Sequence, residues 1–158
     1  GSFSKTLFPG LRLGFVVAPQ ELVSEMRALR RLMVRHPPTN NQRSTAFFLS
    51  LGHYDVFVRR LQRAYRDRWT QMGRSLAQHF PEAKATRGMG GSSYWVTLDS
   101  GSCNTDLLAE KALQNGIFIE PGNVYFQEDD DLSSFRLGFS SIPTERIDPG
   151  IEKLAKLA

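Results

Sequence analysis

The stretch SFSKTLFPGLRLGF (residues 2–15) places one lysine, Lys5, among small hydroxyl-bearing side chains, and an arginine, Arg12, follows after a Pro-Gly turn. A lysine amine attacks carbonyl groups once burial or a neighbouring cation favours its neutral form. Hydroxyl groups, backbone N–H groups and an arginine fork together bind phosphate. The stretch therefore favours a ligand that carries both an aldehyde and a phosphate, although a lysine in such a loop is also common on ordinary surfaces.

The composition is that of an ordinary globular protein. The 158 residues are 41% hydrophobic and 23% charged, and this length allows one domain with a substantial core or two small lobes. No apolar run approaches the ~20 residues that span a bilayer, and no secretory signal pattern is present. Cys103 is the sole cysteine, so an intrachain disulfide is impossible and a reducing, cytoplasmic location is favoured. We interpret it as an ordinary thiol.

The formal net charge of +4 is modest, but the arginines gather in two segments. They are Arg27, Arg30, Arg31 and Arg35 in the first segment and Arg59, Arg60, Arg63, Arg66 and Arg68 in the second. Such clusters bind phosphates or acidic partners, or they form the solvated face of a helix. The helix-face interpretation is favoured because no nucleic-acid-binding motif is present.

Apolar spacing predicts a strand and then helices in the first half of the chain. Residues 11–17 are apolar and end in valines, which predicts a strand. Residues 19–36 and 39–52 are predicted to be helices; two prolines follow the first, and the second ends at Gly52.

The longest predicted element is a helix over residues 53–80. Apolar side chains recur in it every three or four residues, so one face is expected to be buried. They are Phe57, Leu61, Tyr65, Trp69, Met72, Leu76 and Phe80. At 1.5 Å per residue the helix would be roughly 40 Å long, too long for a small globule, and it is predicted to link two lobes.

After Pro81 the pattern changes to short strands and helices, which predicts an α/β or α+β lobe over residues 81–158. The predicted strands cover residues 92–99, 116–122 and 133–141, and the predicted helices cover residues 105–116 and 143–158. The acidic run at residues 128–131 is interpreted as a solvated loop, because adjacent carboxylates point in different directions and no histidine lies at ligand spacing. No metal site is predicted.

The tetrapeptide RLGF occurs twice, at residues 12–15 and 136–139. The flanking sequences differ, so the two copies are not an internal repeat. On a strand, alternation puts the apolar residues of the second copy on one face and Arg136 with Gly138 on the other. An arginine beside a glycine leaves room for another group to approach the backbone. Each copy is therefore predicted to provide an anion-binding site.

Several blocks of the sequence resemble one known family. Residues 2–19 resemble the cofactor-lysine motif of fold-type I pyridoxal-phosphate enzymes, the aspartate aminotransferase superfamily. Residues 88–98 resemble the glycine-rich entry to its small domain, residues 116–126 its G-x-x-x-x-P-G-x-x-F block, and residues 134–140 the strand whose arginine binds the substrate carboxylate. The resemblance covers essentially the whole chain and implies an α/β fold: the C-terminal portion of the fold-type I transferase fold, with a long connecting helix and an α+β small lobe.

By matched position, the resemblance assigns a role to five residues. It implies that Lys5 binds the aldehyde of pyridoxal 5'-phosphate covalently, and that Ser2 and Arg12 hold the phosphate. Ser4 is a further candidate phosphate ligand. Arg136 would bind the α-carboxylate of an amino-acid ligand.

A narrower resemblance concerns residues 4–15 and 49–69, which are similar to MocR-type regulators. These proteins fuse a GntR-like winged-helix DNA-binding domain to an aminotransferase-like domain; transaminases of the aminoadipate and kynurenine type have similar blocks. The resemblance implies a transcriptional regulator that senses an amino acid, an amine or the cofactor. Two alternatives stay open: a class I/II aminotransferase, and a structural or dimerisation piece without a cofactor. Whether the domain acts as a transaminase is likewise open.

The resemblance also implies what lies outside the chain. The family places the aspartate that pairs with the pyridine nitrogen, and the aromatic that stacks on the ring, before the lysine. We therefore expect a C-terminal fragment: the end of the large domain at residues 1–52, a connecting helix at 53–80 and the small domain at 81–158. Alone, it is expected to be inactive and to bind pyridoxal phosphate weakly or not at all. A homodimer, DNA binding only through a missing N-terminal domain, a cytoplasmic location and no membrane contact are implied.

Overall fold

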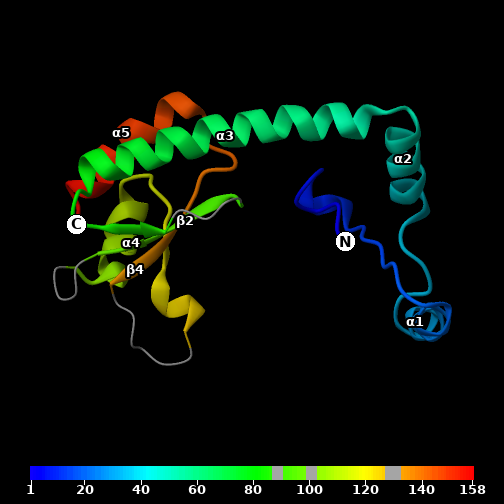
Figure 1. Ribbon diagram of the computed structural model, residues 1–158. Coiled ribbons are helices and arrows are strands. Elements are labelled where there is room, and N and C mark those ends of the chain that lie inside the picture. Colours follow the sequence, from blue (N-terminus) through cyan, green and yellow to red (C-terminus); the bar gives the residue numbers. More distant parts are fainter. Residues whose placement is uncertain (87–90, 99–102, 127–132) are drawn as a thin grey trace. The chain divides into compact units, whose positions relative to one another are not determined.

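The computed structural model describes residues 1–86, 91–98, 103–126 and 133–158 (Figure 1). The chain divides into two compact units, Gly1–Leu61 and Gln62–Ala158. The division falls inside the long helix α3, His53–His79, so this helix contributes its first part to one unit and its larger second part to the other.

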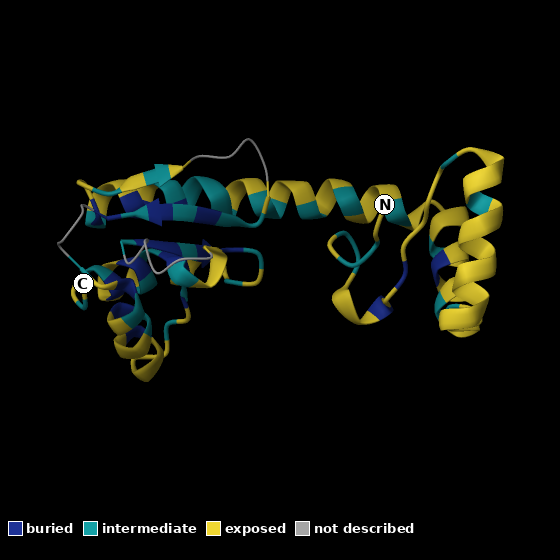
Figure 2. Cartoon of the chain, turned by 90° about the horizontal axis from the view of Figure 1, so that it is seen from below, coloured by how far each residue is buried: buried dark blue, intermediate teal, exposed yellow. Residues whose placement is uncertain are grey.

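The first unit is helical. Its elements are a 3-10 turn at Pro9–Leu11, helix α1 at Gln20–Met33, helix α2 at Thr39–Ser50 and the start of α3. The predicted helices over residues 19–36 and 39–52 are thus confirmed. Gly52 follows α2 with φ +74°, the left-handed conformation that ends many helices. No residue of α1 is buried, and Figure 2 draws this helix almost entirely in the exposed colour.

The predicted strand over residues 11–17 is wrong. Leu11 belongs to the 3-10 turn, and Arg12 after it has a left-handed backbone with φ 51°. The segment makes one isolated bridge, between Gly14 and Ser2. A strand needs the backbone hydrogen bonds of a neighbouring strand. Within the described residues none pairs with the valines of this segment, and Val17 is 90% exposed.

The second unit is built on a four-stranded antiparallel sheet with the strand order β1-β2-β4-β3. The strands are β1 at Lys84–Thr86, β2 at Ser93–Thr97, β3 at Glu120–Pro121 and β4 at Ser134–Gly138. Strands β2 and β4 confirm the predictions over residues 92–99 and 133–141 with shorter bounds. Strand β1 was not predicted.

The predicted strand over residues 116–122 shrinks to the two residues of β3. Before β3, the Ile117 N–H donates to the Ala112 carbonyl at 2.9 Å, so this part of the backbone caps helix α4 (Thr105–Gln114) instead of pairing with β4. After β3, Gly122–Tyr125 forms a 3-10 turn. Pro121 also lacks the N–H that a longer ladder would use.

The core of the second unit lies on one face of the sheet. Strand β4 alternates as expected: Phe135, Leu137 and Phe139, the residue that follows the strand, are at most 3% exposed. They pack with the second part of α3, with α4 and with helix α5, Thr144–Ala155. The helices predicted over residues 53–80, 105–116 and 143–158 are therefore confirmed, with shorter bounds.

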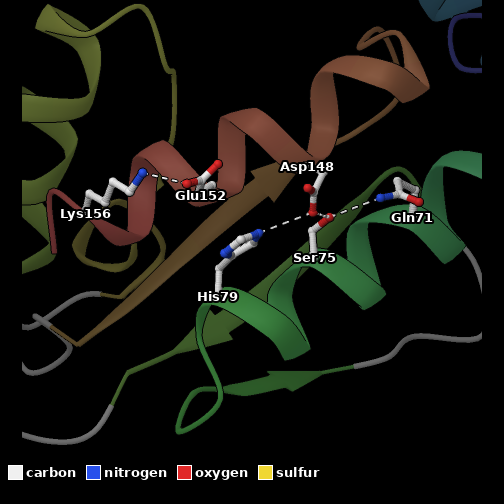
Figure 3. Close-up of polar contacts among 6 residues, drawn as sticks. All are labelled: Gln71, Ser75, His79, Asp148, Glu152 and Lys156. Carbon is white, nitrogen blue, oxygen red and sulfur yellow. Dashed lines mark hydrogen bonds and ion pairs between the residues drawn. The ribbon is translucent and has the colours of Figure 1, made fainter.

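Helices α3 and α5 are joined by a polar cluster (Figure 3). The buried Ser75 hydroxyl donates to Asp148 Oδ1 at 2.7 Å, and His79 Nε2 lies 3.3 Å from the same oxygen. Gln71 Nε2 donates to the Ser75 hydroxyl at 3.3 Å. These hydrogen bonds, that of Ser75 first and that of His79 next, lower the pKa of Asp148. The cluster ties α5 to α3.

Candidate functional site

The predicted phosphate ligands share one loop of the first unit. The antiparallel bridge between Ser2 and Gly14 closes residues 2–14 into a loop. Ser2 therefore lies beside the segment that follows Arg12, although Ser2 and Arg12 are ten positions apart in the sequence. The Ser2 hydroxyl also accepts a hydrogen bond from the Ser4 backbone N–H at 3.2 Å. The structure thus brings Ser2, Ser4 and Arg12 onto the same loop.

The loop is fixed by two leucines and by α2. Leu11 and Leu13 are buried, with 5% and 8% of their surfaces exposed. The Leu13 carbonyl accepts from the Phe3 N–H at 3.0 Å, and the Leu11 carbonyl accepts from Asn41 Nδ2 at 3.0 Å. The two buried leucines and the hydrogen bond from Asn41 therefore hold the loop in place.

Lys5 and Arg12 are the two cations of this loop. Lys5 lies on a turn in which the Leu7 N–H donates to the Phe3 carbonyl at 2.8 Å. Both cations are exposed, and within the described part of the chain neither the Lys5 amine nor the Arg12 guanidinium has a hydrogen-bond or ion-pair partner. Arg12 does not lie on a strand face, as its tetrapeptide had suggested, because its backbone is left-handed. Both groups are available to an anion or a carbonyl.

Arg136 belongs to the second unit, on the sheet face away from the core. In the antiparallel register it stands between Trp95 of β2 and Glu120 of β3. Directly opposed residues of antiparallel strands project from the same face. Trp95, Arg136 and Glu120 therefore form a row across three strands.

Arg136 is held by three side chains. Its Nη1 donates to Glu120 Oε2 in a close ion pair and to the Tyr125 hydroxyl at 3.3 Å, and its Nε donates to the Ser93 hydroxyl at 3.1 Å. The Tyr125 hydroxyl in turn donates to Glu120 Oε2. The hydrogen bonds from Tyr125 and Arg136 lower the pKa of Glu120, so this side chain is a carboxylate at neutral pH.

An aromatic group borders Arg136. The Trp95 ring centroid lies 5.5 Å from that of Tyr125 and 6.0 Å from that of Phe126, both in edge-on arrangements. Such contacts stabilise the position of a ring beyond the area they bury. Tyr125 is therefore held against Trp95 while its hydroxyl bridges Glu120 and Arg136.

A cavity of about 600 Å³ adjoins this cluster at the β3 edge of the sheet. Glu120 and Arg136 line it together with Phe118, Gly138 and Arg146. Its size suits a small molecule, and its lining mixes apolar side chains with a few charged groups, as ligand sites do.

The carboxylate-binding role of Arg136 stays a prediction from the sequence, and its three side-chain partners, Ser93, Glu120 and Tyr125, were not predicted. The proposed ligands Ser2, Ser4, Lys5 and Arg12 lie in the other unit. The missing signal was strand register: the pairing of Glu120 with Arg136 identifies the partner, and no pattern in residues 116–126 alone gives that pairing.

Two stretches singled out in the sequence lie outside the described residues: the glycine-rich residues 88–90 and the acidic run at 128–131. Among the residues that the structure describes, no group of three or more potential metal ligands occurs. No helix in this described part is long and apolar enough to cross a membrane.

The long helix, the small antiparallel sheet and the arginine on its open face define the class of fold: the chain has the fold of the C-terminal portion of fold-type I aminotransferases. Residues 1–154 match the family described as Aminotransferase class I and II. The chain belongs to this family.

Similar curated proteins include regulators and enzymes. The HTH-type transcriptional regulator TauR of Rhodobacter capsulatus is 45% identical over 157 residues, which are 99% of this chain and 32% of TauR. The 2-aminoadipate transaminase of Thermus thermophilus is 30% identical over 157 residues, 99% of this chain and 39% of the enzyme. The chain thus spans about a third of the length of the curated relatives it matches.

Solved structures of aminotransferases have the same fold as this chain over the part that it covers. The α-aminoadipate aminotransferase LysN of Thermus thermophilus, complexed with N-(5'-phosphopyridoxyl)-L-leucine, superposes with a TM-score of 0.88 at 29% identity, covering 99% of this chain and 40% of LysN. The multiple substrate aminotransferase of Thermococcus profundus gives a TM-score of 0.89 at 30% identity, covering 99% of this chain and 39% of that enzyme.

Proposed function

We propose that this chain is the effector part of a pyridoxal-phosphate-binding transcriptional regulator that responds to an amino acid or to the cofactor. The observation that carries the proposal is the loop closed by Ser2 and Gly14, which presents Lys5 and Arg12 without protein partners among the described residues. The 45% identity to the regulator TauR over 99% of the chain favours the regulator class.

The donor set of the loop fits pyridoxal phosphate. Lys5 would bind the aldehyde, while the Ser2 hydroxyl and the Arg12 guanidinium would hold the phosphate, with Ser4 as a further donor. When bound, the cofactor supplies an electrophilic carbonyl and an electron sink. Phosphate binding needs no side chain to leave a protein partner, because both cations of the loop are unpaired among the described residues.

Arg136 would bind the carboxylate of the ligand. Arg136 lies on the sheet face away from the core and adjoins a cavity of suitable size. Only 34% of its side chain is exposed, so solvent screens its charge incompletely. Ligand binding would shift a conformational equilibrium of the longer protein towards the state that binds the ligand more tightly. DNA affinity would follow that shift.

The longer protein would have further domains around this chain. Residues 1–52 would complete a large cofactor-binding domain, residues 53–80 would connect it, and residues 81–158 would form the small domain. A winged-helix domain before residue 1 would bind DNA, and the protein would act as a cytoplasmic homodimer.

A second candidate is a true aminotransferase, favoured by the 30% identity to a 2-aminoadipate transaminase over 99% of the chain. In that case Lys5, once released from the cofactor, would move a proton as the general base. The residues of the chain are compatible with both candidates.

One experiment separates them. The full-length protein is loaded with pyridoxal phosphate, mixed with each of the twenty L-amino acids, and assayed for cofactor absorbance, binding to its own promoter DNA and formation of a 2-oxo acid. The proposal predicts that one amino acid changes the absorbance and the DNA affinity without oxo-acid turnover. Steady oxo-acid formation would instead establish the enzyme, and a Lys5→Ala variant that keeps the cofactor absorbance would refute the lysine assignment.

A further inference from the structure

The nitrogens of Arg136 that a ligand carboxylate needs are already engaged. A guanidinium binds a carboxylate most strongly through two parallel N–H groups on neighbouring nitrogens. Two such pairs exist: the two terminal nitrogens Nη1 and Nη2, and Nη2 with Nε. Which pair is open to a ligand therefore depends on the protein contacts of each nitrogen.

Each of the two pairs contains one nitrogen in use. Nη1 donates to Glu120 and to Tyr125, which accounts for both of its N–H groups, and Nε donates to Ser93. Among the described contacts Nη2 is the nitrogen without a partner. A bidentate carboxylate can therefore bind only after one protein acceptor has left.

Glu120 is the acceptor whose charge matters. It carries the same group as the ligand would bring, and the register of β3 against β4 places it directly opposite Arg136. Only about a third of either side chain is exposed, so solvent screens the pair incompletely. Tyr125 donates to the same oxygen of Glu120 and thereby stabilises the paired state.

We propose that Glu120 is a specificity-determining residue that competes with the ligand carboxylate for Arg136. The inference rests on the proposed role of Arg136 as the carboxylate-binding residue. A carboxylate on a molecule with no other contact to the protein binds weakly, because Glu120 already pairs with Arg136. A carboxylate on a molecule that is also held by a second group benefits from a high effective concentration and displaces Glu120. The site thus selects ligands that carry both groups.

The test compares two adducts that differ only in the carboxylate. N-(5'-phosphopyridoxyl)-L-leucine carries it, and N-(5'-phosphopyridoxyl)-3-methylbutylamine lacks it. Their dissociation constants are measured on the cofactor-free full-length protein, and the ratio of the second to the first gives the carboxylate preference. The variants are Glu120→Gln, Glu120→Ala, Arg136→Ala and the matched control Glu110→Gln, whose side chain is exposed on α4.

Loss of the Glu120 charge is expected to raise the carboxylate preference about five-fold in both Glu120 variants, as for other half-exposed ion pairs. Glu110→Gln should leave it unchanged, and Arg136→Ala should reduce it to about one. An unchanged or smaller preference in both Glu120 variants, together with a loss in Arg136→Ala, would overturn the inference and leave the proposed function standing. An unchanged preference in Arg136→Ala, or no binding of either adduct, would overturn both.

Discussion

The same tetrapeptide, RLGF, adopts different structures in the two units. At residues 136–139 its first three residues belong to β4, which pairs with a strand on either side, and Phe139 follows the strand. At residues 12–15 it follows a 3-10 turn, begins in the left-handed conformation and makes one isolated bridge. Its phenylalanine is 1% exposed in the second copy and 52% exposed in the first. The difference lies in the neighbours: within the described residues the first copy has a single bridge, whereas the second copy lies between two strands and over the core of its unit.

The two arginines differ in the same way. Arg136 donates to Ser93, Glu120 and Tyr125, whereas Arg12 has no side-chain partner among the described residues. Arg136 is therefore held in place and paired with a carboxylate, whereas the Arg12 guanidinium has no such partner among the described residues. The comparison predicts that the two copies respond differently to every matched substitution.

The largest expected difference concerns the two phenylalanines. Phe139→Ala should lower the free energy of unfolding of the second unit by about 3–5 kcal/mol, because a buried ring in contact with Tyr65 and Tyr94 is lost. Phe15→Ala should cost less than about 1 kcal/mol. Urea unfolding followed by tryptophan fluorescence measures the first effect, since Trp69 and Trp95 both lie in the second unit, and circular dichroism follows the whole chain. Equal losses in the two variants would contradict the comparison.

The second largest difference is expected between the glycines of the two copies, Gly14 and Gly138, in how an added methyl group changes cofactor binding. A Cβ on Gly14 would stand 2.8 Å from the Gly1 carbonyl oxygen, so the backbone beside the bridge to Ser2 must shift, whereas a Cβ on Gly138 meets no described atom within 4 Å. Gly14→Ala is expected to weaken pyridoxal phosphate binding by the full-length protein about ten-fold, the effect of forcing an extra methyl group into a packed site. Gly138→Ala should change it by less than a factor of two or so. Spectroscopic titration with the cofactor measures both, and a larger effect at Gly138 would reverse the assignment.

A smaller change in the free energy of unfolding is expected at the polar cluster of Ser75, His79 and Asp148, which ties α5 to α3 in the second unit. Ser75→Ala removes a buried hydroxyl that donates to Asp148, and it should lower the free energy of unfolding by about 1 kcal/mol. Ser50→Ala, at the end of α2 in the first unit, is the matched control and should change it by less than about 0.5 kcal/mol. If both variants unfold at the same urea concentration as the parent chain, the cluster has no stabilising role.

The pH dependence of the same cluster gives the smallest effect. The pKa of Asp148 in the folded chain is below its ordinary value of 3.8, so its contacts contribute stability at neutral pH that is lost as the pH falls below about 4. Asp148→Asn should make the acid loss of stability less steep, and Asp67→Asn on the exposed side of α3 should not. Thermal unfolding between pH 2.5 and 6 measures the slopes; a steeper slope in Asp148→Asn would contradict the assigned contacts.

Much of the fold could be predicted because its signals are local. Helical spacing gave α1, α2 and α3, and alternation gave the buried face of β4. The prediction of a strand over residues 11–17 was wrong because a strand needs a paired neighbour, and no described strand pairs with this segment beyond the bridge to Ser2. The strand over residues 116–122 failed because Ile117 uses its N–H to cap α4.

The candidate site residues likewise fall into those that a local motif indicates and those that depend on strand register. Roles for Lys5, Ser2, Arg12 and Arg136 could be predicted from short motifs, and these roles stay predictions. Glu120 and Tyr125 were not predicted, because their role follows from the register of β3 against β4 and from a turn after Pro121. Their identities alone look like an ordinary polar edge strand.

We propose that the two RLGF arginines bind two different anions, Arg12 the phosphate of the cofactor and Arg136 the carboxylate of the ligand. The most direct measurement is the affinity of full-length Arg12→Ala and Arg136→Ala for the phosphopyridoxyl adducts with and without a carboxylate. Arg12→Ala is expected to weaken both adducts alike, about ten-fold or more, and Arg136→Ala to weaken only the adduct with the carboxylate. Equal weakening of both adducts by Arg136→Ala, or no weakening by Arg12→Ala, would contradict the claim.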